Sequence, residues 1–104
     1  MRAVLQRVSR TSVSIDDTET ARIGPGLAVF VCVEDGDGEA EVDLFTRKIA
    51  AMRIFEDDAG KMNRSVTDVG DAALVVSQFT LAAEMAINLI NDGPVTIWMN
   101  SREG

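Results

Sequence analysis

Three polar residues stand at the end of an otherwise apolar stretch, in the segment Ser77-Gln78-Phe79-Thr80. Successive side chains of a strand point to opposite faces, so Ser77 and Phe79 would share one face and Gln78 and Thr80 the other. Such a strand end can present hydroxyl, amide and main-chain groups to a cleft. The alternative is that these side chains only satisfy the backbone of their own strand end.

A second candidate is Asn91-Asp92-Gly93-Pro94, whose residue types are those of turns. Gly93 has no side chain to block close approach, and the bond before Pro94 can be cis at modest cost. Together they can offer main-chain carbonyls to a ligand. A bare turn between two strands is the alternative.

The chain has no histidine, which removes the commonest general base, the commonest metal ligand and every Ser-His or Cys-His pair. The alternation of acids from Asp35 lacks the glycine and glutamate of a calcium loop, because Ala40 and Thr46 stand in their places. Gly24 and Gly26 lack the third glycine of a dinucleotide-binding turn. We expect neither a metal nor a cofactor.

The elements that must position these residues are mostly strands. Val42, Phe45, Ile49 and Met52 recur at helical spacing and predict one helix over residues 39–52, with Asp37 as its N-cap. Apolar runs and alternation predict strands over residues 1–9, 12–16, 20–23, 27–33, 53–56, 73–81, 85–90 and 95–99. Several strands and one clear helix, without regular alternation, predict an α+β fold in layers.

Composition restricts the remaining possibilities. With 104 residues and 46% apolar content, the chain should form a single domain, residues 1–104. It shows no membrane span and no secretory signal, so we expect it in the cytoplasm. The one cysteine, Cys32, has apolar neighbours and is expected to be buried. A net charge of −7 disfavours nucleic acid, although clustered arginines leave room for a local basic face.

A family resemblance joins these features. Ser77-Gln78-Phe79-Thr80-Leu81-Ala82 and Asn91-Asp92-Gly93-Pro94-Val95-Thr96 resemble the two signature motifs of the D-aminoacyl-tRNA deacylases. Supporting segments follow in the family's order: Leu5-Gln6-Arg7-Val8, Gly24-Pro25-Gly26-Leu27, Arg53-Ile54-Phe55 and Gly60-Lys61-Met62-Asn63. The similarity extends over nearly the whole chain.

The resemblance implies a homodimeric β/β/α sandwich that hydrolyses D-aminoacyl-tRNA and glycyl-tRNA. Residues 77–80 would line one wall of the site, with Met85 beside the substrate. Gly93-Pro94, with a cis bond, would reach in from the partner subunit and exclude an L-side chain through its main chain. Arg7 is similar to a family arginine that supports this motif, and Ile97 and Trp98 are simpler as core or interface anchors.

The mechanism must work without imidazole. The hydroxyl of Thr80 is a weak nucleophile until a base activates it, and no base is evident nearby. We therefore favour a site in which main-chain N–H groups around Phe79 and Thr80 bind the oxyanion. The ribose 2′-hydroxyl of the substrate would help to activate water.

The chain departs from the family between Ala82 and Glu84, where about forty residues of the family pattern, with an amphipathic helix, have no counterpart. Two predicted strands abut there without turn residues, so we expect omitted residues rather than a true junction. A true deletion would favour a non-catalytic dimerisation module. A small RNA-binding domain ranks third, because only 5% of the residues are aromatic.

Overall fold

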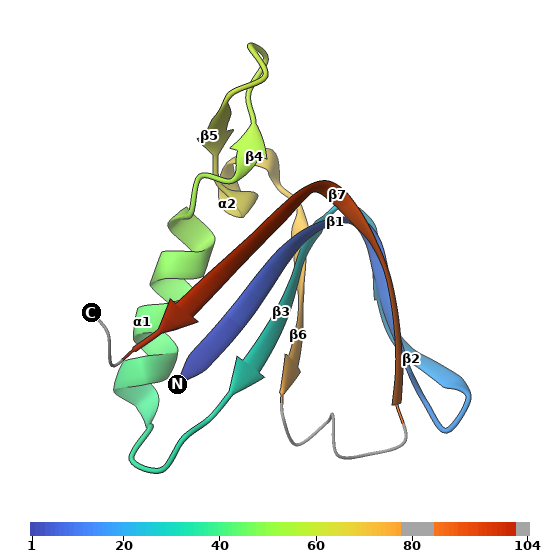
Figure 1. Ribbon diagram of the computed structural model, residues 1–104, viewed down its shortest axis with the longest axis vertical. Helices are drawn as coiled ribbons and strands as arrows, with labels where there is room; N and C mark the ends of the chain where they lie inside the picture. Colours follow the sequence, from blue (N-terminus) through green and yellow to red (C-terminus); the bar gives the residue numbers. More distant parts are fainter. Residues whose placement is uncertain (78–84, 102–104) are drawn as a thin grey trace.

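The computed structural model describes residues 1–77 and 85–101, apart from the side chains of residues 85, 86 and 94. Most strands form one five-stranded sheet, in which β2-β1-β3-β6 are neighbours and β7 pairs with β1. The sheet bends into two halves that face each other, and the helix α1 lies against the outside of one half (Figure 1). The elements are β1 (Arg2–Ile15), β2 (Thr18–Ile23), β3 (Gly26–Cys32), α1 (Glu39–Ala51), β4 (Phe55–Glu56), β5 (Met62–Arg64), α2 (Val66–Val69), β6 (Ala72–Ser77) and β7 (Met85–Asn100). The predicted α+β class, with mostly antiparallel strands and one clear helix, is confirmed.

Strand β1 is the centre of the sheet. One of its edges pairs with β3 over residues 2–8 and then with β2 over residues 11–15, while the other edge pairs with β7. The prediction of separate strands over residues 1–9 and 12–16 is therefore wrong. No breaker interrupts the sequence between them, and the pairing with β7 shifts register on both sides of Val8, which lets one strand serve both halves.

Two connections depend on backbone conformation. Asp16 and Asp17 both have positive φ, 51° and 64°, as a two-residue hairpin turn between β1 and β2 requires. Gly26 begins β3 where the parallel strand β6 passes close by. A Cβ atom on Gly26 would lie 1.9 Å from the carbonyl oxygen of Ala72, so a side chain there would push β6 away.

The core lies between the helix and one face of the sheet. Leu5, Leu27 and Val29 are almost fully buried there against Phe45 of α1. The helix ends at Ala51, close to the predicted boundary. Its N-cap is Gly38 rather than the predicted Asp37, and the Gly38 N–H donates to the Glu41 carboxylate over 2.7 Å.

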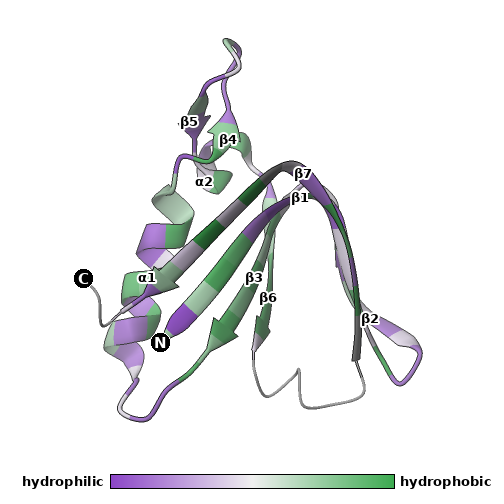
Figure 2. Cartoon of the chain, in the orientation of Figure 1, coloured by the Kyte–Doolittle hydropathy of each residue, from purple (hydrophilic) through white to green (hydrophobic). Residues whose placement is uncertain are grey.

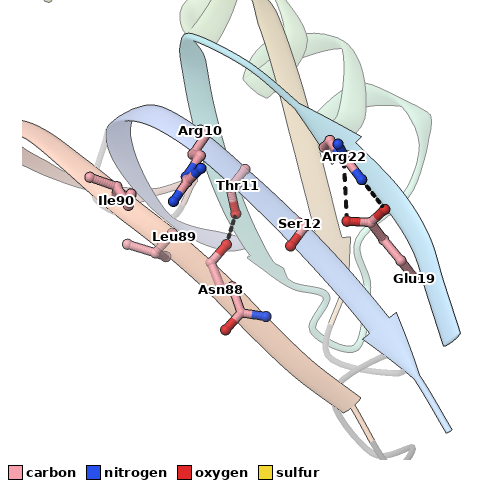
Figure 3. A pocket seen from close by; sticks show the side chains of 8 residues that line it. All are labelled: Arg10, Thr11, Ser12, Glu19, Arg22, Asn88, Leu89 and Ile90. Carbon is pink, nitrogen blue, oxygen red and sulfur yellow. Dashed lines mark hydrogen bonds and ion pairs between the residues drawn. The ribbon is translucent and has the colours of Figure 1, made fainter. Parts of the chain in front are cut away.

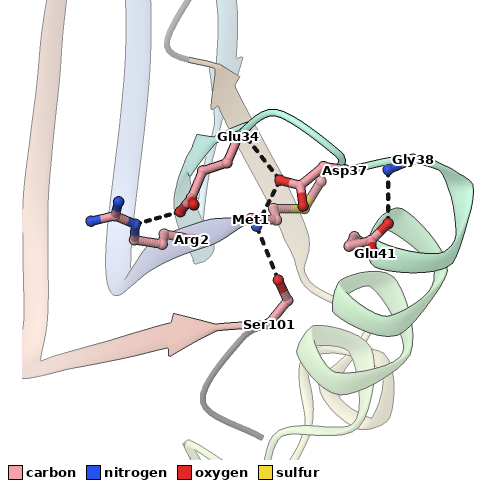
Figure 4. A network of polar contacts seen from close by, with 7 residues as sticks. All are labelled: Met1, Arg2, Glu34, Asp37, Gly38, Glu41 and Ser101. Atoms are coloured by element: carbon pink, nitrogen blue, oxygen red, sulfur yellow. Dashed lines mark hydrogen bonds and ion pairs between the residues drawn. The ribbon is translucent and has the colours of Figure 1, made fainter.

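Asp37 has a different role, shown in Figure 4. Its carboxylate accepts a hydrogen bond from the Glu34 N–H over 2.8 Å and lies 2.6 Å from the Met1 ammonium. That ammonium also donates to the Ser101 hydroxyl over 3.0 Å. These contacts join the start of β1, the loop before α1 and the end of β7. Because the Asp37 carboxylate is engaged in these contacts, it does not cap the helix.

The opposite face of the same half carries an apolar row that neither helix of the described residues covers. Val4 pairs with both Phe30 and Trp98, so the three side chains stand in line across β3, β1 and β7. Trp98 is 76% exposed and Cys32, at the end of β3, is exposed as well. The predicted burial of Cys32 is wrong. Cys32 lies two residues after Phe30 on β3 and therefore shares the open face of the sheet rather than the face that packs against α1. Figure 2 shows how hydrophobic this half is along β3 and β6.

The packing between helix and sheet leads to a stability prediction. Leu5→Ala should lower the free energy of unfolding by about 2–5 kcal/mol, because it leaves a cavity where the side chain is 0% exposed. Urea denaturation followed by circular dichroism measures this change. Thr18→Ala on exposed β2 is the control and should stay within about 0.5 kcal/mol of the parent. Equal effects of the two changes would contradict the assigned core.

Candidate functional site

Residues 92–95 form a bulge within β7. Gln6 pairs with Thr96 and Val8 with Asn91, so residues 92–95 lie opposite Arg7 alone. The prediction of two strands separated by a turn is wrong here. The segments on both sides pair with the same strand β1, and the turn-type residues between them are therefore accommodated as a local excursion rather than a reversal of the chain.

The side chain of Arg7 supports this bulge through hydrogen bonds. Its side chain is buried, its Nε donates to the Asp92 carbonyl over 2.8 Å and its Nη1 donates to the Ile54 carbonyl over 2.7 Å. The Asp92 carboxylate lies 3.5 Å from Nε. One guanidinium thus ties the bulge to the segment that precedes β4. Its planar fork of donors suits two acceptors at fixed positions, which a lysine ammonium would not match.

Gly93 is required by this arrangement. Its φ of +124° is a conformation that L-residues rarely adopt, and a Cβ atom would lie 2.2 Å from Nη2 of Arg7. The close packing of Arg7 against residue 93 is therefore a second reason why this position must be glycine, besides access for a ligand. Gly93 and its neighbours Asn91 and Asp92 are exposed on the other side.

The other predicted site residues are described only in part. Ser77 ends β6, is half-buried and pairs with Val31. Gln78, Phe79 and Thr80 lie outside the described residues, as do the side chains of Met85 and Pro94. Their roles, and the cis bond before Pro94, stay predictions.

The register of the sheet separates the two motifs within one chain. Ser77 is level with Val31 and Ala3, whereas the bulge is level with Arg7, four residues further along β1. Four residues extend over about 13 Å, and the three strand spacings from β6 to β7 add about 14 Å in the perpendicular direction. Ser77 and Gly93 therefore lie roughly 19 Å apart, too far for both to contact one reacting group. In Figure 1 the arrowhead of β6 and the top of the β7 arch are correspondingly at opposite ends of the sheet.

Two carboxyl groups with lowered pKa values, those of Asp57 and Asp68, have structural roles. The pKa of Asp57 is lowered by N–H groups of Lys61 and Ala59 in the β4–β5 hairpin. The pKa of Asp68 is lowered by hydrogen bonds with Ser65 at the start of α2. Both carboxyls are held in the ionised form and cap local turns. Neither shift is the upward one that a carboxyl needs to act as a general acid near neutral pH.

Within residues 1–77 and 85–101, no three acidic, cysteine or histidine side chains group as metal ligands. In the same part of the chain, no helix has the length and apolarity needed to cross a membrane.

Comparison with known proteins identifies the family. A family model described as D-Tyr-tRNA(Tyr) deacylase matches residues 4–85. The chain belongs to this family. A D-aminoacyl-tRNA deacylase of Ruegeria pomeroyi is 44% identical over 144 residues, covering 96% of this chain and 99% of the relative. One of Paracoccus denitrificans is 40% identical over 147 residues, with 99% of each chain covered. The predicted membership of the deacylase family, a class of hydrolases, is confirmed.

A solved structure shows the same fold. The protein named c-Myc DNA Unwinding Element Binding Protein superposes with a TM-score of 0.90 at 30% identity, covering 97% of this chain and 99% of the other. The deacylase fold is thus shared with a protein whose name records binding to DNA.

The alignments also bear on the predicted interruption after Ala82. An alignment of 144 residues to the Ruegeria relative exceeds the 104 residues of this chain, so about forty positions of that relative have no counterpart here. The family model ends at Met85, immediately after the predicted interruption. Residues 78–84 lie outside the described part of the chain, and the prediction that residues were omitted there stays a prediction.

Substitution of Gly93 tests the geometry of the bulge. Gly93→Ala should destabilise the protein by about 1–3 kcal/mol, because it forces both a strained φ and a contact with Arg7. Thermal unfolding measures the loss. Gly24→Ala is a matched control, since no heavy atom lies within 4 Å of the added Cβ. If both variants unfold like the parent protein, Arg7 does not pack beneath residue 93.

Proposed function

We propose that this deacylase hydrolyses the ester between a D-amino acid, or glycine, and the 3′ end of tRNA. The observation that carries the proposal is the Arg7-supported bulge at Gly93, in a chain that belongs to the D-Tyr-tRNA(Tyr) deacylase family. The bulge turns exposed main chain outward from a rigid support. A site that must distinguish mirror images needs main chain held in one position, because its discrimination depends on steric exclusion.

The active unit is a homodimer in this proposal. Two observations support it: Ser77 and Gly93 lie too far apart to share a substrate within one chain, and the row of Val4, Phe30 and Trp98 leaves an apolar surface open. A second copy can bring its own bulge to the strand end at Ser77. Burial of an exposed tryptophan at a subunit interface would also stabilise the pair.

Chirality is enforced by rejection in this arrangement. Gly93 and Pro94 of one subunit would face the α-carbon of the amino acid bound near residues 77–80 of the other. A D-side chain would point away from this main chain, whereas an L-side chain would collide with it. Glycine has no side chain to reject, so glycyl-tRNA should also be hydrolysed.

The chemistry uses water as the nucleophile. Water attacks the ester carbonyl carbon, and main-chain N–H groups around Phe79 and Thr80 stabilise the oxyanion. The bond between the carbonyl carbon and the ribose 3′-oxygen then breaks, and the 3′-oxygen takes up a proton as the amino acid leaves. With no histidine in the chain, the 2′-hydroxyl of the substrate assists the attacking water. The protein contributes position and electrostatic stabilisation.

One observation favours a second candidate, a non-catalytic dimerisation module. About forty positions of the Ruegeria relative have no counterpart here, and we infer that they belong next to the motif of residues 77–82, where the chain departs from the family pattern. If that region covers the substrate in the relatives, its loss would leave the sheet and its apolar row but not a closed site.

Hydrolysis of paired substrates separates the two candidates. The chain should deacylate a D-aminoacyl-tRNA at least about a hundredfold faster than its L counterpart, because steric exclusion discriminates strongly between mirror images. Release of radiolabelled amino acid measures both rates. Sedimentation in the same buffer should show a dimer. A dimer without activity on either substrate would instead support the non-catalytic module.

Truncation of Thr80 tests the mechanism. Thr80→Ala should keep most of the activity, because the oxyanion donors are main-chain groups that survive truncation of the side chain. A 2′-deoxy terminal adenosine in the substrate should be the more damaging change. A loss near a thousandfold for Thr80→Ala would establish the hydroxyl as the nucleophile instead.

A further inference from the structure

A polar face occupies the half of the sheet that α1 does not cover. Ser12 of β1 pairs with Arg22 of β2 on one side and with Asn88 of β7 on the other, so their three side chains share one face. Arg10, two residues before Ser12, belongs to the same face and pairs with Ile90. These residues line a half-open hollow of about 540 Å³ (Figure 3).

This face is more basic than the molecule as a whole. The chain has a net charge of −7, yet the hollow is lined by two arginines and one acid, Glu19. Glu19 accepts from Nε and Nη2 of Arg22 over 3.2 and 2.7 Å, which leaves Nη1 of Arg22 for another partner. Arg10 makes no ion pair within the described part of the chain. The hollow therefore combines two guanidinium groups with the Ser12 hydroxyl and the Asn88 amide.

The size of the face indicates what it can bind. The row from Arg22 to Asn88 extends over two strand spacings, about 10 Å, which exceeds the reach of one phosphate group. Arginine forms bidentate hydrogen bonds with phosphate oxygens, and serine and asparagine side chains commonly contact phosphates and sugars. A string of phosphates and riboses fits these donors better than a single small anion does.

The face also lies at a suitable distance from the candidate site. Arg10 and Ser12 follow Arg7 by three and five residues along β1, which corresponds to about 10–17 Å in an extended strand. The Arg7-supported bulge and this face are thus neighbours on the same two strands, β1 and β7. A few nucleotides can connect them.

We infer that the face of Arg10, Ser12, Arg22 and Asn88 binds the phosphate backbone of the tRNA close to its aminoacylated 3′ end. The inference rests on the proposed function, because it names the surface that holds the substrate of that site. It explains how an acidic protein retains a polyanion: repulsion from the rest of the surface keeps binding weak, and a local cationic face sets where the strand lies.

Binding of uncharged tRNA, followed by fluorescence anisotropy at several salt concentrations, tests this face directly. Arg10→Ala should weaken binding about tenfold and reduce the slope of log affinity against log salt by roughly 0.7–0.9, the contribution of one phosphate contact. Arg47→Ala, which removes the same charge from exposed α1, is the matched control and should change neither quantity. Asn88→Asp, an isosteric change at an exposed position, should weaken binding as well.

A phosphate-free substrate separates this inference from the proposed function. Hydrolysis of a D-aminoacyl-adenosine ester should be unchanged in Arg10→Ala, since that ester cannot reach the face. A parent protein that hydrolyses neither this ester nor D-aminoacyl-tRNA would overturn the proposed function alone, because the binding measurement still decides the role of the face. Unchanged tRNA binding in both Arg10→Ala and Asn88→Asp would overturn the inference, as would an equal loss in Arg47→Ala. Sedimentation checks that the variants keep the parent's oligomeric state, and if Arg10→Ala alters it, Asn88→Asp decides.

Discussion

The candidate site depends on one buried guanidinium. Arg7 is only 5% exposed, and burial of a charged group is unfavourable unless hydrogen bonds compensate for the lost water. The carbonyl groups of Asp92 and Ile54 supply that compensation, and in doing so they fix the bulge of β7 relative to the segment before β4. Gly93 must stay without a side chain because the same guanidinium occupies the space below it. The shape of the exposed main chain at residues 91–93 thus follows from the requirement to satisfy Arg7.

The bend of β1 gives the sheet two halves with different surfaces. Where β1 pairs with β3, its side chains face α1 on one side and form the open row with Phe30 and Trp98 on the other. Where it pairs with β2, it presents the arginine-containing face instead. The bulge lies between these halves, opposite Arg7. A single strand therefore organises the core, the open apolar row and the arginine-containing face.

The open apolar row of Val4, Phe30 and Trp98 has the character of an interaction surface. A large exposed aromatic side chain beside other apolar groups is a feature of interaction surfaces. Helix α1 covers the opposite face, so it cannot shield this one. The alignment to the Ruegeria relative leaves about forty positions of that protein without a counterpart in this chain.

Sequence alone was sufficient where the physical cause is local or where a whole motif is matched. The spacing of Val42, Phe45, Ile49 and Met52 determined the helix, because side chains at that spacing share one face, and paired motifs determined the family. It was insufficient for Cys32, for the joining of residues 2–15 into one strand and for the bulge at residues 92–95. Turn-type residues look the same whether the chain reverses or bulges, and only pairing of both flanks with β1 decides between them. The position of Arg7 beneath Gly93 likewise arises from contacts between residues more than eighty positions apart, which no local pattern contains.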